Sequence, residues 1–274
     1  MKIKELIIEG KNKLKENKIE DSNIISNVLA QKVLGMDKIQ IIINDKELEE
    51  SQIVEYNKNI QKIIDGVPLQ YITNYQEFMG YGFYVDENVL IPQPDTEILV
   101  QEVIEIVKNK ENINILDICT GSGCIGISLK KELENAQVTL SDISLQALEI
   151  ARKNAEINKV DDKIKIIQSD MFENIKEKYD IIVSNPPYIE TSIIETLDKT
   201  VQNEPHIALD GGKDGLKFYK ILIEQGMKYL KDNGYLCLEI GYDQKEKVME
   251  LVKGKEVYCK KDLSGNDRVI VIKK

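Results

Sequence analysis

Hydrophobic side chains recur at helical intervals through the first quarter of the chain. Leu6 and Leu14 fall on one face of a predicted helix, and Tyr56 and Ile60 repeat this spacing further along. No group of residues typical of catalysis accompanies the pattern. The spacing therefore predicts a small helical domain over residues 1–75, whose role is packing or recognition of a partner.

The pattern changes at residues 66–68, a turn-forming sequence that ends the helical spacing. Polar and apolar residues then alternate among several glycines, so we expect a short β-hairpin that links two domains over residues 76–92. Asp95 and Thr96 follow as helix-capping residues ahead of an amphipathic helix.

From residue 113 onward, short apolar runs alternate with amphipathic segments. The expected strands cover residues 113–118, 137–142, 163–168, 179–184 and 234–240. One expected helix follows the first strand and ends near Leu133, and three more cover residues 144–158, 215–230 and 243–253. Strands that alternate with helices indicate an α/β fold with a doubly wound parallel sheet. Residues 256–274 contain two strands and a turn with no helix between, which predicts an antiparallel hairpin at the end of a domain over residues 93–274.

Composition narrows the classes of function. The chain has 37 Lys and Arg against 47 Asp and Glu, a net charge of -10, which argues against a protein that grips bare DNA or RNA because phosphate contacts need clustered basic residues. The four cysteines form no C-x-x-C pair, so neither a disulfide framework nor a metal site is expected. No segment has the ~20 apolar residues of a membrane helix, and the N-terminus has no apolar signal region. We therefore expect a cytoplasmic protein.

A glycine-rich loop follows the first expected strand of the sheet. Residues 121–126, GSGCIG, fit the dinucleotide-binding pattern G-x-G-x-x-G. Gly121 and Gly123 allow a tight turn and a close approach of the backbone to a ligand. Asp142 ends the next strand, where a carboxylate accepts hydrogen bonds from ribose hydroxyls. NAD and S-adenosylmethionine both carry an adenosine ribose, so this fingerprint alone does not separate them.

Two further acids favour S-adenosylmethionine. Asp117 lies inside the first strand, where a carboxylate repels a pyrophosphate but attracts the ammonium group of a sulfonium cofactor. Asp170 follows the third strand, and its neighbour Met171 is placed to cover an adenine ring. Either acid alone is equally well explained as a capping or turn carboxylate. Together they favour the cationic cofactor.

Asn185, Pro186, Pro187 and Tyr188 directly follow the fourth strand, on the same edge of the sheet as the glycine-rich loop. The prolines fix the backbone and remove two donors, so the Asn185 side-chain oxygen and the Pro186 carbonyl can both accept from one planar NH₂ group. Tyr188 is expected to form an apolar wall or to stack on that group. Holding both hydrogens stabilises the positive charge that develops on the nitrogen during methyl transfer, so no strong base is needed. The single histidine, His206, accordingly has no expected catalytic role.

These motifs together resemble the HemK/PrmC family of glutamine methyltransferases, which act on peptide chain release factors. The similarity spans nearly the whole chain, through GVPLQYI, IPQPDTEILV, DICTGSGCIGISL, SDISLQALEIARKNAEIN, SDMF, VSNPPYI, EPHIALDGGKDGLKFY, LEIGYDQ and DLSGNDRVIVIK. The resemblance implies a helical recognition domain followed by a Rossmann-like methyltransferase domain. It also implies methyl transfer from S-adenosylmethionine, leaving S-adenosylhomocysteine, to the Gln side chain in the Gly-Gly-Gln loop of bacterial class I release factors.

The resemblance also implies roles for individual residues. Asn185, Pro186 and Tyr188 would be catalytic, and with Pro187 they would form the substrate slot, while the cofactor would be held by Cys119, Thr120, Gly121, Ser122, Gly123, Asp142, Met171 and Asn185. Two positions depart from the family pattern. Gln93 stands where the family usually has Arg, which removes any ion pair assigned there, and Cys119 stands where Gly is common.

Three other functions stay open on the residues alone. A nucleic-acid methyltransferase acting on adenine or guanine also needs a slot for an NH₂ group, but it needs a basic face and a target-recognition domain as well. An NAD oxidoreductase is supported only by the glycine-rich loop, and a non-catalytic binding module is disfavoured by the presence of Asn185. We therefore expect a release factor as partner, with no direct contact to nucleic acid or membrane, and nothing in the sequence requires more than a monomer.

Overall fold

The computed structural model of this protein describes residues 1–44 and 46–274, and the chain folds into two compact units. The helical unit comprises Met1–Asn74 and Asp198–Asn203, and the sheet unit comprises Tyr75–Leu197 and Glu204–Lys274. Within the helical unit, the Asn203 Nδ2 atom donates to the Gly66 carbonyl oxygen at 3.1 Å. The chain therefore enters the helical unit twice, an arrangement that the hydrophobic pattern does not indicate.

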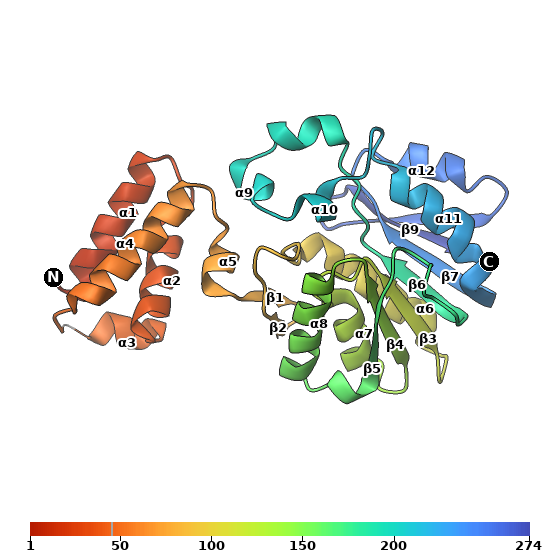
Figure 1. Cartoon of the computed structure of the whole chain (residues 1–274), viewed down its shortest axis with the longest axis horizontal. Coiled ribbons are helices and arrows are strands. Elements are labelled where there is room, and N and C mark those ends of the chain that lie inside the picture. Colours follow the sequence, from red (N-terminus) through yellow and green to blue (C-terminus); the bar gives the residue numbers. More distant parts are fainter. Residues whose placement is uncertain (45) are drawn as a thin grey trace. The chain divides into compact units, whose positions relative to one another are not determined.

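Three long helices form the core of the helical unit (Figure 1). Its helices are α1 (Ile3–Glu16), α2 (Ser22–Leu34), α3 (Lys38–Ile43), α4 (Glu50–Ile64), α5 (Leu69–Thr73) and α9 (Lys199–Gln202). Leu6 and Leu14 of α1 are fully buried, as their spacing predicts. The Tyr56 ring of α4 fills the space beside Gly10 of α1, where a Cβ would lie 2.2 Å from the phenol oxygen. Its hydroxyl donates to the Ser26 carbonyl of α2 at 3.2 Å, so one side chain ties the three helices together.

The sheet unit contains a seven-stranded sheet in the order β5-β4-β3-β6-β7-β9-β8 (Figure 1). Its strands are β3 (Asn114–Ile118), β4 (Gln137–Asp142), β5 (Ile164–Gln168), β6 (Tyr179–Ser184), β7 (Leu230–Glu239), β8 (Glu256–Lys261) and β9 (Asp267–Lys273). The strands from β5 to β7 in this order pair in parallel, whereas β9 pairs antiparallel with both β7 and β8. The predicted α/β fold with a terminal antiparallel hairpin is confirmed.

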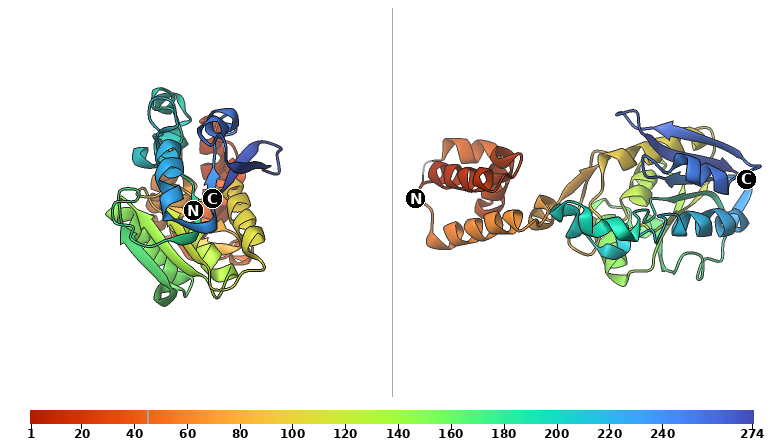
Figure 2. Two further views of the ribbon diagram at one scale, coloured as in Figure 1. Left: turned by 90° about the vertical axis from the view of Figure 1, so that its right-hand side faces the viewer. Right: turned by 90° about the horizontal axis from the view of Figure 1, so that it is seen from above.

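Helices cover both faces of this sheet (Figure 1 and Figure 2). They are α6 (Glu97–Val107), α7 (Cys124–Glu132), α8 (Leu145–Ile157), α11 (Lys217–Tyr229) and α12 (Lys245–Leu251). Because successive side chains of a strand alternate between faces, Ile115 packs in the core beneath α6 to α8, and Leu116 packs in the core beneath α11 and α12. The same alternation turns Asp117 toward α7. Of the helices in the described ranges, none is both long and apolar enough to cross a lipid bilayer.

Short elements complete the sheet unit. These are β1 (Gln76–Phe78), β2 (Tyr81–Phe83), α10 (His206–Leu209) and the 3₁₀ helices η1 (Pro94–Thr96), η2 (Asp161–Lys163) and η3 (Thr191–Thr196). β1 and β2 form the expected hairpin, and Phe78 and Phe83 are fully buried in the core beneath α6 to α8. The hydrophobic pattern predicts neither η3 nor α10. An isolated parallel bridge between Ile189 and Asp210 holds α10 beside the segment that follows β6.

Helix α7 approaches the sheet closely at Gly126. A Cβ on Gly126 would lie 2.2 Å from Leu140 Cδ2 of β4 and 3.1 Å from Asp117 Oδ2 of β3. Gly226 of α11 is also inside a helix, but the nearest atom to a Cβ there would be Phe172 Cζ at 3.4 Å. The packing therefore requires glycine at position 126 and tolerates a methyl group at position 226.

We expect Gly126→Ala to lower the free energy of unfolding by about 1–3 kcal/mol, because the added methyl group overpacks the interface between helix and sheet. Gly226→Ala is the matched control and should raise the free energy of unfolding by up to about 1 kcal/mol, because alanine is the better helix former. Urea unfolding followed by circular dichroism measures both. An equal change in the two variants would contradict the role assigned to the contact with Leu140.

Candidate active site

The chain leaves β3 through a turn in which every second residue adopts a left-handed backbone conformation. Cys119, Gly121 and Gly123 have φ values of 59°, 53° and 82°. Glycine adopts this conformation freely, whereas for a residue with a Cβ it costs about 1–2 kcal/mol. The position of Cys119 therefore suits glycine, and this chain accepts local strain by placing cysteine there.

Asp117 braces this turn from the core side. Its side chain is fully buried, and its Oδ2 atom accepts hydrogen bonds from Thr120 Oγ1 at 2.5 Å and from the Gly126 amide at 3.0 Å. Burial raises the pKa of this carboxyl to about 7, against the opposing effect of the two hydrogen bonds. Sequence reasoning assigned Asp117 an attraction for the cofactor's ammonium group. The structure instead places it behind the turn and off the cavity wall.

Asp142 holds the turn from the next strand. Its Oδ2 atom accepts from the Gly121 amide at 2.9 Å, and its Oδ1 atom accepts from the Ser144 amide at 2.9 Å. Burial raises the pKa of Asp142, and these backbone donors oppose the rise. Each carboxylate oxygen has a second lone pair, so Asp142 can still accept hydrogen bonds from a ligand.

A cavity of about 230 Å³ opens at the carboxyl ends of β3, β4 and β6. Eight of the residues that the sequence indicates for the site line it: Cys119, Thr120, Gly121, Ser122, Asp142, Met171, Asn185 and Pro187. These residues come from four separate stretches of the sequence, and the parallel sheet brings them to one edge. Doubly wound sheets bind their ligands at the carboxyl ends of the strands, so this is where a ligand site is expected.

Gly123, Pro186 and Tyr188 lie off this wall. Gly123 precedes α7, and a Cβ there would approach Ile127 Cδ1 to 2.8 Å, so its part is to shape the turn. The sequence predicts that Tyr188 forms an apolar wall of the slot or stacks on the planar group of the substrate. Instead its hydroxyl lies 3.5 Å from Glu239 Oε1, and its carbonyl accepts from Gln244 Nε2 at 2.9 Å. Tyr188 thus packs behind the wall, against the end of β7.

The sequence reasoning missed part of the wall. Its further residues include Leu90, Pro92, Gln93, Thr96, Ile207, Ala208, Lys217 and Phe218. Thr96 is the most informative of them, because its Oγ1 atom accepts a hydrogen bond from Asn185 Nδ2 at 3.2 Å. The sequence PQPDTE, which contains Thr96, is distinctive, but from its pattern we predict only helix capping at this position. The hydrogen bond also directs the Asn185 side-chain oxygen away from Thr96, where it can accept from a substrate.

The charges of the cavity wall suit a cationic adenosine cofactor. Its charged residues are Asp142, Asp170 and Lys217, so acids outnumber bases where a pyrophosphate would need donors. A Cβ on Gly121 would meet no atom within 4 Å, so the backbone is open to a ligand at this point. Met171 adds a mostly buried apolar surface. S-adenosylmethionine fits this combination of an acceptor for ribose, an open backbone and an apolar cover.

Metal-ligating side chains do not gather around the cavity. Over residues 1–44 and 46–274, no group of three or more His, Cys, Asp or Glu residues could hold a metal ion. The polar groups of the wall are instead the carboxylates of Asp142 and Asp170, the Lys217 amine, side-chain amides, hydroxyls and backbone atoms. They can orient a ligand through hydrogen bonds.

We expect Asp142→Asn to weaken S-adenosylmethionine binding by about tenfold or more, because a charged acceptor for the ribose hydroxyls is lost. Asp170→Asn changes an exposed acid on the same wall and should weaken binding by less than about fivefold. Calorimetric titration of each variant with S-adenosylmethionine measures the two dissociation constants. Unchanged affinity in Asp142→Asn would remove Asp142 from the cofactor site.

Solved structures with this arrangement include methyltransferases. A methyltransferase from Pyrococcus furiosus has a TM-score of 0.55 at 18% identity, with 80% of this chain and 98% of that chain covered. A T. thermophilus 16S rRNA methyltransferase in complex with AdoMet and guanosine has a TM-score of 0.53 at 17% identity, with 73% and 49% covered. At these identities the likeness concerns the fold alone.

Sequence comparison carries the assignment further. Residues 5–73 match the PrmC N-terminal domain family, and residues 94–203 match the Methyltransferase small domain family. The chain is 42% identical to a release factor glutamine methyltransferase of Clostridium botulinum, with 100% of both chains covered. It is 35% identical to a release factor glutamine methyltransferase of Aquifex aeolicus, with 99% of this chain and 95% of the relative covered. The chain therefore belongs to the HemK/PrmC family of release factor glutamine methyltransferases.

Proposed function

We propose that this protein transfers a methyl group from S-adenosylmethionine to the side-chain amide nitrogen of the Gln in the Gly-Gly-Gln loop of bacterial class I release factors. The observation that carries the proposal is the placement of Asn185 on the same cavity wall as the turn after β3 and Asp142. The full-length similarity to release factor glutamine methyltransferases supports the choice of substrate.

The residues that would hold the cofactor lie on three neighbouring segments. S-adenosylmethionine, when bound, supplies an electrophilic methyl group on a sulfonium. The turn from Cys119 to Ser122 would wrap the methionine part, Asp142 would accept from the ribose hydroxyls, and Met171 would cover the adenine. None of these residues acts as an acid or base, so their contribution is to fix the distance and direction of the displacement.

Asn185, which lines the cavity, would supply one acceptor for the substrate, and the carbonyl of Pro186, the next residue, which lies off the wall, would supply the second. An amide nitrogen is a weak nucleophile because its lone pair is delocalised into the carbonyl. When the Asn185 side-chain oxygen and the Pro186 carbonyl hold its two hydrogens, they stabilise the positive charge that grows on the nitrogen as the new bond to carbon forms. One of the two protons then leaves, and the product is a neutral secondary amide.

The helical unit would recognise the protein substrate. Its helix α3 exposes Ile39, Ile42 and Ile43, and exposed apolar groups of this kind mark surfaces that bind other proteins. A cytoplasmic, monomeric enzyme that contacts neither nucleic acid nor membrane belongs to the same proposal. The excess of acidic residues over basic ones supports a protein partner over a nucleic acid.

A labelling experiment tests the reaction and its target residue together. The purified protein is mixed with methyl-labelled S-adenosylmethionine and an unmethylated class I release factor, and a parallel reaction uses the same factor with the Gln of its Gly-Gly-Gln loop changed to Ala. Label on the first factor alone is the expected result. Label on both factors would show that a residue other than this Gln is methylated. Label on neither factor would overturn the proposed substrate.

Asn185→Ala should reduce methyl transfer by ~10²-fold or more, because one positioned acceptor is lost in the transition state. Cofactor affinity should change by less than about tenfold, since Asp142 and the turn after β3 remain. Asn109→Ala, at an exposed position in the turn after α6, is the control and should behave as the parent protein. A normal turnover rate in Asn185→Ala would exclude Asn185 from the reaction.

A further inference from the structure

Glu239 is a buried acid that the mechanism above does not use. It is the last residue of β7 and is 2% exposed. The Tyr188 hydroxyl donates to its Oε1 atom at 3.5 Å, and the Thr96 hydroxyl is a second neighbour, which lowers the pKa of Glu239. Its Oε2 atom has no hydrogen-bond partner among the residues that the structure describes. A buried carboxyl with so few hydrogen bonds lowers the stability of the fold, so a functional reason for its presence is expected.

Thr96 connects this acid to the substrate slot. The Thr96 hydroxyl accepts a hydrogen bond from Asn185 Nδ2 at 3.2 Å, so its own proton has to point to another acceptor. An ionised Glu239 can only accept hydrogen bonds, and as a neighbour of the Thr96 hydroxyl it can serve as that acceptor. The direction of donation then runs from Asn185 through Thr96 to Glu239. This direction leaves the Asn185 oxygen for the substrate.

Protonation of Glu239 removes this constraint. A neutral carboxyl can donate to the Thr96 hydroxyl, and the Thr96 proton is then free to point at Asn185. The Asn185 amide can now turn over, so that it accepts from Thr96 with its oxygen and presents its NH₂ group to the slot. A donor would then face the NH₂ group of the substrate, which blocks the hydrogen bonds that methyl transfer requires.

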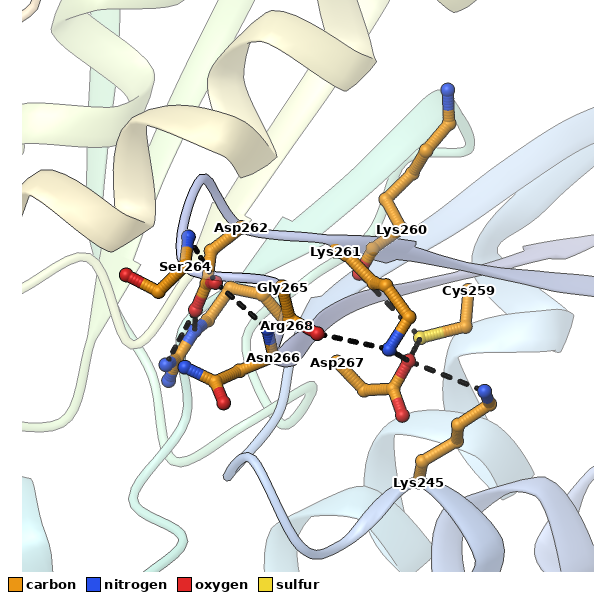
Figure 3. Close-up of polar contacts among 10 residues, drawn as sticks. All are labelled: Lys245, Cys259, Lys260, Lys261, Asp262, Ser264, Gly265, Asn266, Asp267 and Arg268. Carbon is orange, nitrogen blue, oxygen red and sulfur yellow. Dashed lines mark hydrogen bonds and ion pairs between the residues drawn. The ribbon is translucent and has the colours of Figure 1, made fainter.

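The surroundings of Glu239 favour proton uptake near neutral pH. The titratable groups that face it are Arg268 on β9, Asp95 on η1, Tyr188 after β6, Tyr219 on α11 and Cys124 on α7. Arg268 lowers the pKa of Glu239, but its charge is shared, because its Nη2 atom lies 3.0 Å from Asp95 Oδ2 and 2.9 Å from Asp262 Oδ2. Figure 3 shows Arg268 turned toward Asp262 within the hairpin between β8 and β9. Burial is the largest effect and raises the pKa of Glu239 to about 7.

We propose that Glu239 is a positioning residue for methyl transfer, which fixes through the Thr96 hydroxyl the face that the Asn185 side-chain amide turns to the substrate nitrogen. The inference rests on the proposed function of the site. It predicts that turnover rises with pH as Glu239 ionises, with a midpoint close to 7. Asp142 and the turn after β3 are not part of this chain of hydrogen bonds, so replacing Glu239 should leave the cofactor affinity at each pH as it is in the parent protein.

Kinetics of Glu239→Gln against release factor test the proposal. The variant side chain can donate to Thr96 as a protonated acid does, so kcat should fall by about tenfold or more and its rise between pH 6 and 8 should vanish, while KM for the release factor stays within about threefold. Glu102→Gln is the matched control, because Glu102 is also a buried glutamate that accepts from a tyrosine, Tyr258, at 2.7 Å. It should keep the parental kcat and pH profile. A parental kcat and pH profile in Glu239→Gln would overturn the proposal.

Thr96 provides a second route in case Glu239→Gln folds poorly. Thr96→Ser keeps the hydroxyl and should retain most of the activity, whereas Thr96→Val keeps the shape without the hydroxyl and should lose as much kcat as Glu239→Gln. Equal activity in Thr96→Ser and Thr96→Val would also contradict the proposal.

A spectroscopic readout separates this inference from the proposed function. In protein labelled with ¹⁵N-asparagine, the Asn185 side-chain NH₂ signal, identified by its loss in Asn185→Ala, should shift with pH around 7 and stop shifting in Glu239→Gln. If the parent protein fails to methylate the release factor but this shift is present, the substrate assignment is wrong and the coupling stands. If the protein methylates the release factor and the Asn185 signal does not respond to pH, the coupling is wrong and the proposed function stands.

Discussion

The alternating left-handed backbone between Cys119 and Gly123 is the constraint on which the site depends. Three such residues in a five-residue turn lead the chain from the end of β3 at Ile118 into α7, which begins at Cys124. The turn is held by two acids from neighbouring strands, Asp117 in the core and Asp142 at the cavity. Because α7 has to approach the sheet closely for these bonds to form, the absence of a side chain at Gly126 is part of the same constraint.

The part of the cavity wall around Asn185 is organised by the direction of hydrogen bonds. Thr96, Asn185 and Glu239 come from three segments that are far apart in the sequence. Asn185 donates a hydrogen bond to Thr96, and Thr96 neighbours the buried carboxyl of Glu239, so the three side chains connect that carboxyl to the substrate slot. The antiparallel hairpin contributes Arg268, whose ion pairs with Asp95 and Asp262 join the end of the chain to the segment that carries Thr96. The hairpin thus does more than extend the sheet: it sets the charge behind the substrate slot.

The sequence predicted most of the fold and the cofactor-binding part of the site, but not the hydrogen bonds around Asn185. Period-two and period-3.6 patterns are local, so the strands, the helices and the terminal hairpin could be derived from them, and the carboxyl ends of parallel strands necessarily bring the turn after β3, Asp142 and Asn185 together. The outward or inward direction of Tyr188 could not be derived, because it depends on packing against β7. The inclusion of Asp198–Asn203 in the helical unit and the bond between Thr96 and Asn185 also rest on contacts between distant segments, which leave no periodic signal.

The wall of the cavity carries two thiols, Cys119 and Cys124. Burial raises the pKa of both, so they stay protonated at neutral pH. The thiolate is the form that peroxides and alkylating agents attack, and a protonated thiol reacts slowly with either. Burial therefore slows the reaction of these two thiols with oxidants, although Cys119 stands where the family commonly has glycine, which has no side chain to oxidise.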